Sequence, residues 1–284
     1  MHSQDLAGAL KAAEAVLARA GVPSPRVDAE LLAAYLLGES VGRVRAMALA
    51  GSPVPAALEP FEQLVAERAR RVPLQHITGR AQFRHLELKV GPGVFVPRPE
   101  TETVVQHAID HARGLSAPKM ADLGTGSGAI AGALATEVPG SQVYAVELSE
   151  LAHAWAERNL VPLGVELILG DLRTALAGQE GTFDVVVSNP PYIPAGAVPR
   201  DPEVAEHDPA MALYGGGADG MELPAAAAAA AARLLKPGGY FIMEHAEVQA
   251  GAVARMLEAS GQWHRVATVL DLTGRERATS ALRR

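Results

Sequence analysis

The stretch Phe183-Asp-Val-Val-Val-Ser-Asn-Pro-Pro-Tyr192 joins a short apolar run to a rigid, polar end. Residues 184–187 have the Val-rich character of a central parallel strand that is covered on both faces. The two prolines that follow end this strand, because proline donates no hydrogen bond to a sheet ladder and its φ is fixed. Asn189 and Tyr192 are therefore expected at the carboxyl end of a strand, where open α/β sheets bind their ligands.

The Asn-Pro-Pro-Tyr end of this stretch has a specific chemical use. An amide or exocyclic amine carries two N–H groups and a poorly nucleophilic lone pair. The side-chain oxygen of Asn189 and the carbonyl oxygen of Pro190 would accept both hydrogens and turn the lone pair toward an electrophile. Tyr192 would form a flat wall beside the substrate group. The alternative is an ordinary Pro-rich turn in which Asn189 caps the strand, and this segment alone does not decide between the two.

Strands and helices alternate on both sides of this stretch. A helix is expected over residues 129–137, and an Ala-rich helix is expected to stop at Pro237-Gly238-Gly239. The alternation predicts a doubly wound parallel α/β sheet. Its seven predicted strands are residues 119–123, 142–148, 165–169, 183–188, 240–244, 264–272 and 277–282.

The residues before this sheet divide into two further segments. Residues 1–72 show helical periodicity but no motif of catalytic or ligand-binding residues. They are therefore predicted to form a small helical domain for packing or recognition. Residues 73–103 alternate apolar and polar side chains around Gly91-Pro92-Gly93, which predicts a β-hairpin linker with its turn region there. The sheet domain is then predicted to cover residues 104–284.

The composition is that of an ordinary soluble protein, with 284 residues of which 49% are hydrophobic and 20% charged. The first twenty residues lack the basic and apolar regions of a secretory signal, and no apolar run reaches the roughly 18 residues that span a membrane. The absence of Cys fits a reducing cytoplasm and excludes thiolate metal ligands, and no metal site is predicted. A formal charge of −7 argues against a broad basic face for duplex DNA. A soluble, cytoplasmic protein is expected.

A glycine-rich loop, Asp122-Leu-Gly-Thr-Gly-Ser-Gly-Ala129, follows the first predicted strand. Its spacing satisfies the G-x-G-x-x-G/A fingerprint of dinucleotide-binding proteins, and Glu147 lies at a suitable separation to bind a ribose diol. The same spacing suits S-adenosylmethionine, because glycines let the amino-acid end of that cofactor approach the backbone. Asp171 would then reach the adenine amino group, and Leu172 would cover the face of the adenine ring.

Three features favour methyl transfer over nicotinamide chemistry. Acidic residues end the second and third strands, a third glycine at Gly128 widens the loop, and the amine-orienting Asn189 segment follows the fourth strand. A dehydrogenase also needs an acid–base group near its hydride acceptor, and the sequence offers no well-placed candidate. His107 and His111 share a helix face but lack the Glu of a zinc-protease motif, so a solvated face is expected there.

These motifs together resemble a known family. The glycine loop followed by Asn189-Pro-Pro-Tyr192 is similar to methyltransferases that alkylate glutamine amides or exocyclic adenine nitrogens. The linker narrows the resemblance to the HemK/PrmC family, the release factor glutamine N5-methyltransferases, and the similarity covers nearly the whole chain. The further segments that carry it are Pro73-Leu-Gln-His-Ile-Thr-Gly79, Gly91-Pro-Gly-Val-Phe-Val-Pro-Arg-Pro-Glu-Thr-Glu102, Glu244-His245 and Gly274-Arg-Glu-Arg277.

The resemblance implies a class I, Rossmann-like methyltransferase fold and S-adenosylmethionine as the cofactor. It implies as substrate the glutamine of the Gly-Gly-Gln loop in class 1 peptide chain release factors. The family often has Asp where this chain has Glu147, and sometimes an aromatic residue where it has Leu172. The residues implied to contact the cofactor are Gly124, Thr125, Gly126, Ser127, Gly128, Glu147, Leu172 and Asn189, and those implied to hold the glutamine are Asn189, Pro190, Pro191 and Tyr192.

Two related activities remain as alternatives: glutamine methylation of a ribosomal protein, and N6-methylation of adenine in nucleic acid. The negative charge and the lack of a separate base-reading domain argue against direct nucleic-acid binding. Arg98 and Glu100 either line a ligand site or pair at a helix start, and the roles of Glu244 and His245 stay open. A solvated loop without a catalytic role is expected for Glu203, Glu206, His207 and Asp208.

Overall fold

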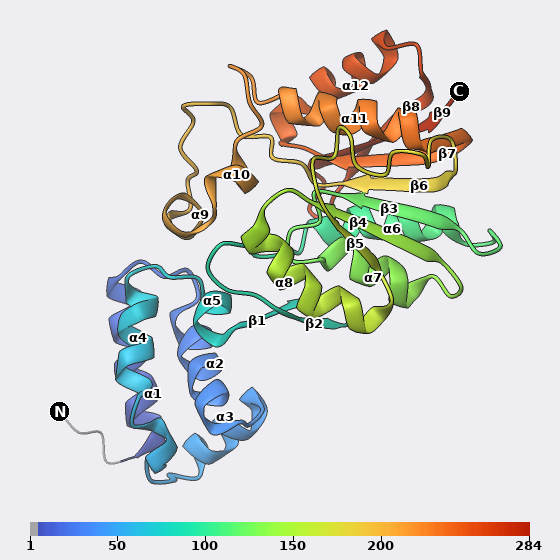
Figure 1. Ribbon diagram of the computed structural model, residues 1–284. Coiled ribbons are helices and arrows are strands. Elements are labelled where there is room, and N and C mark those ends of the chain that lie inside the picture. The colour runs from blue at the N-terminus through green and yellow to red at the C-terminus, as the bar shows by residue number, and fades with distance from the viewer. Residues whose placement is uncertain (1–4) are drawn as a thin grey trace. The chain divides into compact units, whose positions relative to one another are not determined.

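The computed structural model describes residues 5–284, which form two compact units (Figure 1). The helical unit comprises the chain up to Gly79 together with the later segment Pro199–His207. The sheet unit comprises Arg80–Val198 and Asp208–Arg284. The inclusion of residues 199–207 in the helical unit was not foreseen from the sequence.

The helical unit forms because each amphipathic segment has its own start and stop signals. Asp5 caps the first helix, where its side chain accepts from the backbone N–H of Gly8 at 2.7 Å, and Ser40 caps the third. Apolar side chains such as Leu6, Leu17 and Leu32 are fully buried in one core. The elements are α1 (Leu6–Arg19), α2 (Pro25–Leu37), α3 (Val41–Leu49), η1 (Ala56–Leu58), α4 (Phe61–Ala69), α5 (Leu74–Thr78) and α9 (Pro202–His207).

A buried ionic cluster joins α9 to the rest of the helical unit. Arg68 contacts Asp28 at 2.7 Å and Glu203 at 2.8 Å, and Arg71 contacts Glu203 at 2.5 Å. Burial alone would raise the pKa of Glu203, but hydrogen bonds from Arg71 and Arg68 lower it to about 2. The expectation of a solvated loop is therefore wrong for Glu203, because two arginines distant in sequence bind its carboxylate.

The sheet unit is built on seven strands in the order β5-β4-β3-β6-β7-β9-β8. The first five of these are parallel, and β9 is antiparallel to both β7 and β8. This confirms the predicted doubly wound sheet with seven strands. The strands are β3 (Lys119–Leu123), β4 (Gln142–Glu147), β5 (Glu166–Leu169), β6 (Phe183–Ser188), β7 (Leu235–Glu244), β8 (Trp263–Leu270) and β9 (Glu276–Arg283).

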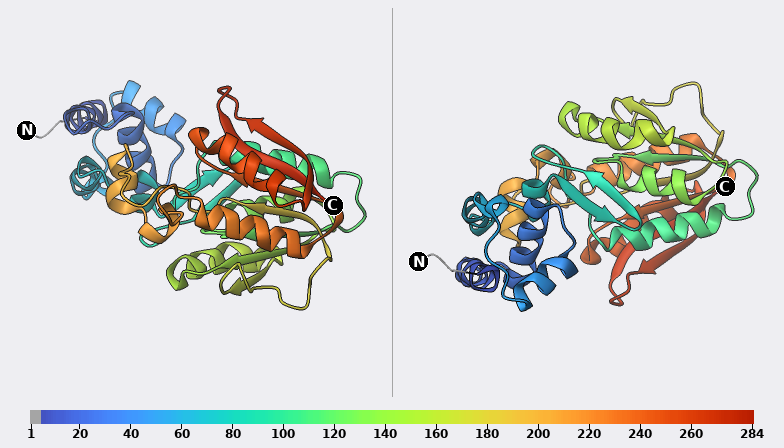
Figure 2. Two further views of the ribbon diagram at one scale, coloured as in Figure 1. Left: turned by 90° about the horizontal axis from the view of Figure 1, so that it is seen from above. Right: turned by 90° about the horizontal axis from the view of Figure 1, so that it is seen from below.

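Helices cover both faces of this sheet (Figures 1 and 2). Alternate strand residues divide between two cores: Val185 and Val187 of β6 belong to one, and Val186 belongs to the other. The first core is closed by α6 (Thr101–Ala112), α7 (Ala129–Glu137) and α8 (Glu150–Leu160), and the second by α11 (Glu222–Leu234) and α12 (Ala250–Ala259). The remaining short elements are η2 (Val161–Leu163), α10 (Ala210–Leu213) and η3 (Glu247–Gln249).

The boundary between α11 and β7 differs most from the sequence prediction, while the other strand ends differ by at most two residues. The Ala-rich helix α11 ends at Leu234, before Pro237-Gly238-Gly239, and these three residues lie inside the longer strand β7. The pairing of β6 with β7 shifts register between Phe183 and Val185, which accommodates the extra residues. Among residues 5–284, no helix has the length and apolar character needed to cross a membrane.

The linker contains a β-hairpin, but its turn is not at Gly91-Pro92-Gly93. The two strands are β1 (Arg80–Phe83) and β2 (Leu86–Lys89), which pair antiparallel around the turn at Arg84-His85. Residues 91–93 instead pass over Trp155 of α8, whose indole Nε1 donates to the Pro92 carbonyl at 3.2 Å. A Cβ at Gly91 would lie only 2.5 Å from this ring, so close packing explains the glycine.

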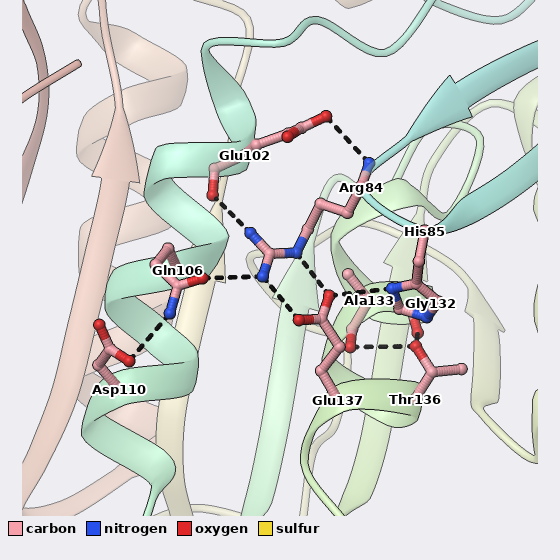
Figure 3. Close-up of polar contacts among 9 residues, drawn as sticks. All are labelled: Arg84, His85, Glu102, Gln106, Asp110, Gly132, Ala133, Thr136 and Glu137. Carbon is pink, nitrogen blue, oxygen red and sulfur yellow. Dashed lines mark hydrogen bonds and ion pairs between the residues drawn. The ribbon is translucent and has the colours of Figure 1, made fainter. Parts of the chain in front are cut away.

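Arg84 fastens the hairpin turn to two helices of the sheet unit (Figure 3). Its guanidinium forms two bonds to the Glu137 carboxylate of α7, at 2.5 and 2.6 Å, and one to Gln106 of α6 at 2.8 Å. Its backbone N–H donates to the Glu102 side chain at 2.9 Å, and its own φ of 54° is left-handed. Tertiary contacts of Arg84 thus stabilise a turn that lacks the usual Gly or Asn signal.

Candidate active site

The candidate site lies where the strand order of the sheet reverses direction. From β3 the chain adds β4 and β5 on one side, and then β6 and β7 on the other, so β3 and β6 are neighbours. Ser188 at the end of β6 donates to the carbonyl of Leu123 at the end of β3, at 2.6 Å. The glycine loop and the Asn189 segment therefore leave the sheet side by side, at the kind of position where doubly wound sheets bind ligands.

The glycine loop between β3 and α7 keeps open space beside its backbone. Gly124 and Gly126 adopt φ values of 81° and 58°, and nothing lies within 4 Å of the position that a Cβ would take at either residue. The backbone N–H groups of Gly124 and Thr125 both donate to the Val146 carbonyl of β4 at 2.9 Å. This left-handed, unobstructed loop has room for a ligand to approach the backbone.

Asp122 stabilises this loop through hydrogen bonds, although no sequence motif gave this residue a role. It is fully buried, and its Oδ2 accepts from the Thr125 hydroxyl at 2.6 Å and from the backbone N–H of Ala131 at 3.1 Å. Its Oδ1 is buried without a hydrogen-bond partner among residues 5–284. Burial raises the pKa of Asp122 to about 7, with a further contribution from the Glu147 carboxylate, and the bonds from Thr125 and Ala131 oppose the increase.

Glu147 ends β4 with its carboxylate against the glycine loop. Oε2 accepts from the backbone N–H of Gly126 and Oε1 from that of Ser149, both at 2.8 Å. Burial raises the pKa of Glu147, although these backbone hydrogen bonds favour the ionised form. Each carboxylate oxygen has a second lone pair, so the group retains the acceptors that a ribose diol requires.

After β5, the Asp171 carboxylate that was expected to bind the adenine amino group is already bound by a neighbouring residue. The Asp171 carboxylate accepts from the backbone N–H and from the guanidinium of Arg173, both at 2.9 Å. The backbone hydrogen bond of Arg173 lowers the pKa of Asp171, and the Arg173 side chain lowers it further. Leu172 is half-buried and packs against the core that α11 and α12 close. The binding of this carboxylate by Arg173 was not foreseen from the sequence.

Asn189 directly follows β6, and the nitrogen of its side-chain amide is hydrogen-bonded within the protein. Nδ2 donates to the hydroxyl of Thr101 at 3.3 Å, and that hydroxyl donates to Oε2 of Glu244 at 2.7 Å. Oδ1 has no hydrogen-bond partner among the described residues, so the acceptor predicted for a substrate N–H remains available. Sequence reasoning missed Thr101, because nothing in its own neighbourhood links it to residue 189.

The next three residues continue from Asn189 as a fixed segment. Pro190 is buried, whereas Pro191 and Tyr192 are half-buried. The backbone carbonyl of Tyr192 accepts from Nε2 of Gln249 at 2.9 Å. Burial raises the pKa of the Tyr192 hydroxyl, which therefore stays neutral near pH 7.

Arg98 and His245, whose roles the sequence left open, are now placed, and so is Asp208. Arg98 pairs with Asp208 at 3.0 Å rather than with Glu100, and its guanidinium lies 5.0 Å from the centre of the Phe95 ring. The Asp208 side chain is almost fully buried, so the expectation of a solvated loop is wrong for it as well. His245 is buried, with Nε2 bonded to the Thr279 hydroxyl at 2.8 Å and Nδ1 to the Ala246 carbonyl at 3.0 Å. Its contacts are those of a neutral structural histidine.

The donor set at this site fits S-adenosylmethionine. The open glycine loop between β3 and α7 suits the amino-acid end of the cofactor, and Glu147 retains the acceptors for its ribose. Asn159 of α8 reinforces the loop, since its Nδ2 donates to the carbonyl of Ser127 at 2.9 Å and to that of Lys89 at 2.9 Å. Asn159 is a second residue that sequence reasoning missed.

Comparison with known proteins matches both parts of the chain. Residues 8–79 match the PrmC N-terminal domain, and residues 87–202 match the methyltransferase small domain. A release factor glutamine methyltransferase from Streptomyces coelicolor is 50% identical over 268 residues, which cover 93% of each chain. The chain belongs to the release factor glutamine methyltransferase family.

Membership in the release factor glutamine methyltransferase family confirms that the chain is a methyltransferase and not a nicotinamide-dependent dehydrogenase. A second relative broadens the chemistry of the group: a 4-amino-L-phenylalanine/4-methylamino-L-phenylalanine methyltransferase from Streptomyces pristinaespiralis is 40% identical, covering 91% of this chain and 89% of that one. A solved 16S rRNA N2 G1207 methyltransferase of T. thermophilus has a TM-score of 0.51 at 24% identity, covering 72% of this chain and 50% of that chain. It supports the fold alone.

Proposed function

We propose that this methyltransferase transfers a methyl group from S-adenosylmethionine to the side-chain amide nitrogen, N5, of the glutamine in the Gly-Gly-Gln loop of class 1 release factors. The observation that carries the proposal is the orientation of Asn189, whose Nδ2 is bound to Thr101 so that Oδ1 is free for a substrate N–H. The proposal is also supported by the S. coelicolor relative, which is named as a release factor glutamine methyltransferase. The proposed location is the cytoplasm, with residues 1–72 serving substrate recognition.

The cofactor, when bound, supplies an electrophilic methyl group. The proposed residues that hold it are Gly124–Gly128, Glu147, Asp171, Leu172 and Asn189. Substrate contact is assigned to Asn189, Pro190, Pro191 and Tyr192, with Asn189 Oδ1 and the Pro190 carbonyl accepting the two N–H groups of the amide.

These contacts orient the amide nitrogen without removing its proton first. With both N–H groups bound, the lone pair is directed away from the acceptors, and Tyr192 restricts the tilt of the amide plane. The proton leaves only as the new N–C bond forms and the bond between the methyl carbon and the sulfonium sulfur breaks, because the nitrogen then becomes acidic. The proton passes to water, and the leaving group is the neutral thioether that remains of the cofactor. Such positioning is worth about 7–11 kcal/mol of the barrier when the reacting atoms are held in near-attack geometry.

The same contacts predict selectivity for an amide or amine over a carboxylate. A glutamate side chain has no N–H to offer Asn189 Oδ1, so binding it would leave a buried acceptor unpaired beside a negative charge. An aromatic amine has the two N–H groups, and the S. pristinaespiralis relative is named for such a substrate. The small-molecule activity must therefore be tested alongside the protein substrate.

The test incubates the protein with methyl-labelled S-adenosylmethionine and one acceptor at a time. The acceptors are an unmodified release factor, the same factor with Gly-Gly-Glu in its loop, an unmodified ribosomal protein mixture, duplex DNA and 4-amino-L-phenylalanine. We expect label on the release factor alone, on its Gly-Gly-Gln peptide. Label on 4-amino-L-phenylalanine, ribosomal protein or DNA, with none on the release factor, would contradict the proposal.

A further inference from the structure

Glu244 is a buried carboxylate that the proposed methyl-transfer chemistry leaves unused. It ends β7, the strand beside β6, and its exposed fraction is only 1%. Thr101, the first residue of α6, lies between Glu244 and Asn189 and is 4% exposed. An ionised group is costly to bury, so its retention beside the reacting segment requires an explanation.

The direction of the hydrogen bonds around Glu244 explains why this buried carboxylate is retained. An ionised carboxylate can only accept, so the Thr101 hydroxyl must donate its single proton to Glu244 Oε2, at 2.7 Å. Toward Asn189 the hydroxyl then has only a lone pair, which accepts from Nδ2 at 3.3 Å. The amide is thereby held with its oxygen turned away from the cluster.

We propose that Glu244 and Thr101 are positioning residues that set the rotation of the Asn189 amide, so that Oδ1 and not Nδ2 faces the substrate nitrogen. The inference rests on the proposed function for its meaning in catalysis, although the rotation itself is a property of the free protein. A flipped amide would direct N–H groups at the N–H groups of the substrate. Two donors facing each other cannot bond, so the flipped form would not bind a substrate productively.

The proposal makes the active rotamer dependent on the charge of Glu244. A protonated Glu244 can donate to Thr101, and the hydroxyl can then donate to Asn189 Oδ1, so the flipped amide is no longer penalised. Burial raises the pKa of Glu244 to about 7, and Glu100 raises it further, while the bonds from Thr101 and Asn189 and the charge of Arg277 lower it. Tyr192 also faces this carboxylate, and its own raised pKa keeps it neutral in this range.

The first test compares Thr101→Val, Thr101→Ser and Glu244→Gln with the wild-type protein. Thr101→Val and Glu244→Gln should each lower kcat by roughly tenfold to a hundredfold, with cofactor affinity unchanged, as for other residues that orient a reacting group. Thr101→Ser should restore most of the activity, because it restores the hydroxyl. Thr136→Val is the matched control, since among residues 5–284 its hydroxyl bonds only to the Gly132 and Ala133 carbonyls within α7.

The pH profile separates positioning from a merely structural role. Wild-type kcat should fall below an apparent pKa of about 7, and Glu244→Gln should lose this acidic limb. Unchanged kcat and an unchanged limb in Thr101→Val and Glu244→Gln would overturn the proposal.

A second readout needs no substrate. The side-chain amide signals of Asn189 in a ¹⁵N spectrum, identified by their loss in Asn189→Asp, should shift with a midpoint near pH 7 in the wild type and not in Glu244→Gln. Absence of this titration in the wild type would sink the inference even if the release factor is methylated. Its presence in a protein that methylates none of the acceptors above would support the positioning and reject the proposed function.

Discussion

The two ends of the Asn189 amide have different surroundings. Nδ2 is bound within the sheet unit by Thr101, whereas Oδ1 has no partner among the described residues. A strand end followed by two prolines places this side chain beyond the last ladder hydrogen bond of β6. Removing the Asn189 amide should therefore weaken interactions with a ligand more than it lowers the stability of the fold.

Asn189→Ala tests this directly. We expect the methylation rate to fall on the order of 10²- to 10³-fold, as when one preorganised hydrogen-bond partner is removed from an active site. Cofactor affinity should change by no more than several-fold. Single-turnover transfer and calorimetric titration measure the two quantities, with Gln82→Ala as a control for the loss of an exposed amide on the hairpin. A variant that turned over normally would exclude the proposed role of Asn189.

Gly126 offers a second comparison at the level of one residue, because the chain contains a matched glycine. Gly126 and Gly140 both have left-handed backbones, with φ of 58° and 76°, and at neither residue does any atom lie within 4 Å of the position that a Cβ would take. An Ala at either site should cost about 1–2 kcal/mol of folding free energy. Only Gly126→Ala should also weaken S-adenosylmethionine binding, which calorimetry can detect. Equal affinities in the two variants would remove the glycine loop from the cofactor site.

At the level of elements, the predictable parts of the chain were those fixed by local patterns. The strands β3 and β6 are buried on both faces, so their short, largely apolar runs identify them without knowledge of their partners. The hairpin turn was placed incorrectly because Gly91-Pro92-Gly93 has the composition of a turn, yet it packs against Trp155. The actual turn at Arg84 is stabilised by side chains of α6 and α7, which no local pattern reveals.

Arg84→Ala should accordingly destabilise the sheet unit by roughly 2–4 kcal/mol, because it removes the two hydrogen bonds that Arg84 donates to the partly buried Glu137 carboxylate. Arg80→Ala is the matched control on the same hairpin. Arg80 pairs with Glu87, but both side chains are more than half exposed, so its loss should cost no more than about 1 kcal/mol. Urea unfolding followed by circular dichroism measures both. Similar costs for the two variants would contradict the role of Arg84 as the residue that holds the turn.

At the level of the whole molecule, the sequence predicted which strand ends would carry chemistry but not which side chains would meet there. Asn189 lies 88 positions after Thr101 in the chain, and Glu244 lies 143 positions after it. Their contact depends on the strand order and on where α6 begins, and neither can be read from a local motif. The same holds for Glu203, whose arginine partners lie 132 and 135 positions earlier.

Buried carboxylates should also give the whole protein a distinctive stability profile. The pKa of Asp122 is raised to about 7 in the folded state, so the native protein binds more protons than the unfolded chain between the ordinary value near 4 and 7. The free energy of unfolding should therefore fall as pH rises through this range. Glu203 behaves in the opposite sense: its pKa is lowered to about 2, so its contribution is complete above pH 4.5 and is lost on acidification toward 2.

Asp122→Asn should remove the penalty for the buried charge while keeping an acceptor for Thr125 and Ala131. Relative to the wild type, we expect the variant to gain stability between pH 5 and pH 8, by an amount on the order of 2–4 kcal/mol at the upper end. Glu203→Gln is the control, because its effect should be constant between these two pH values. Urea unfolding at pH 5 and pH 8 provides the measurement. A pH-independent difference for Asp122→Asn would mean that this carboxyl is already ionised at pH 5, and that the loop is held by a charge rather than by a protonated acid.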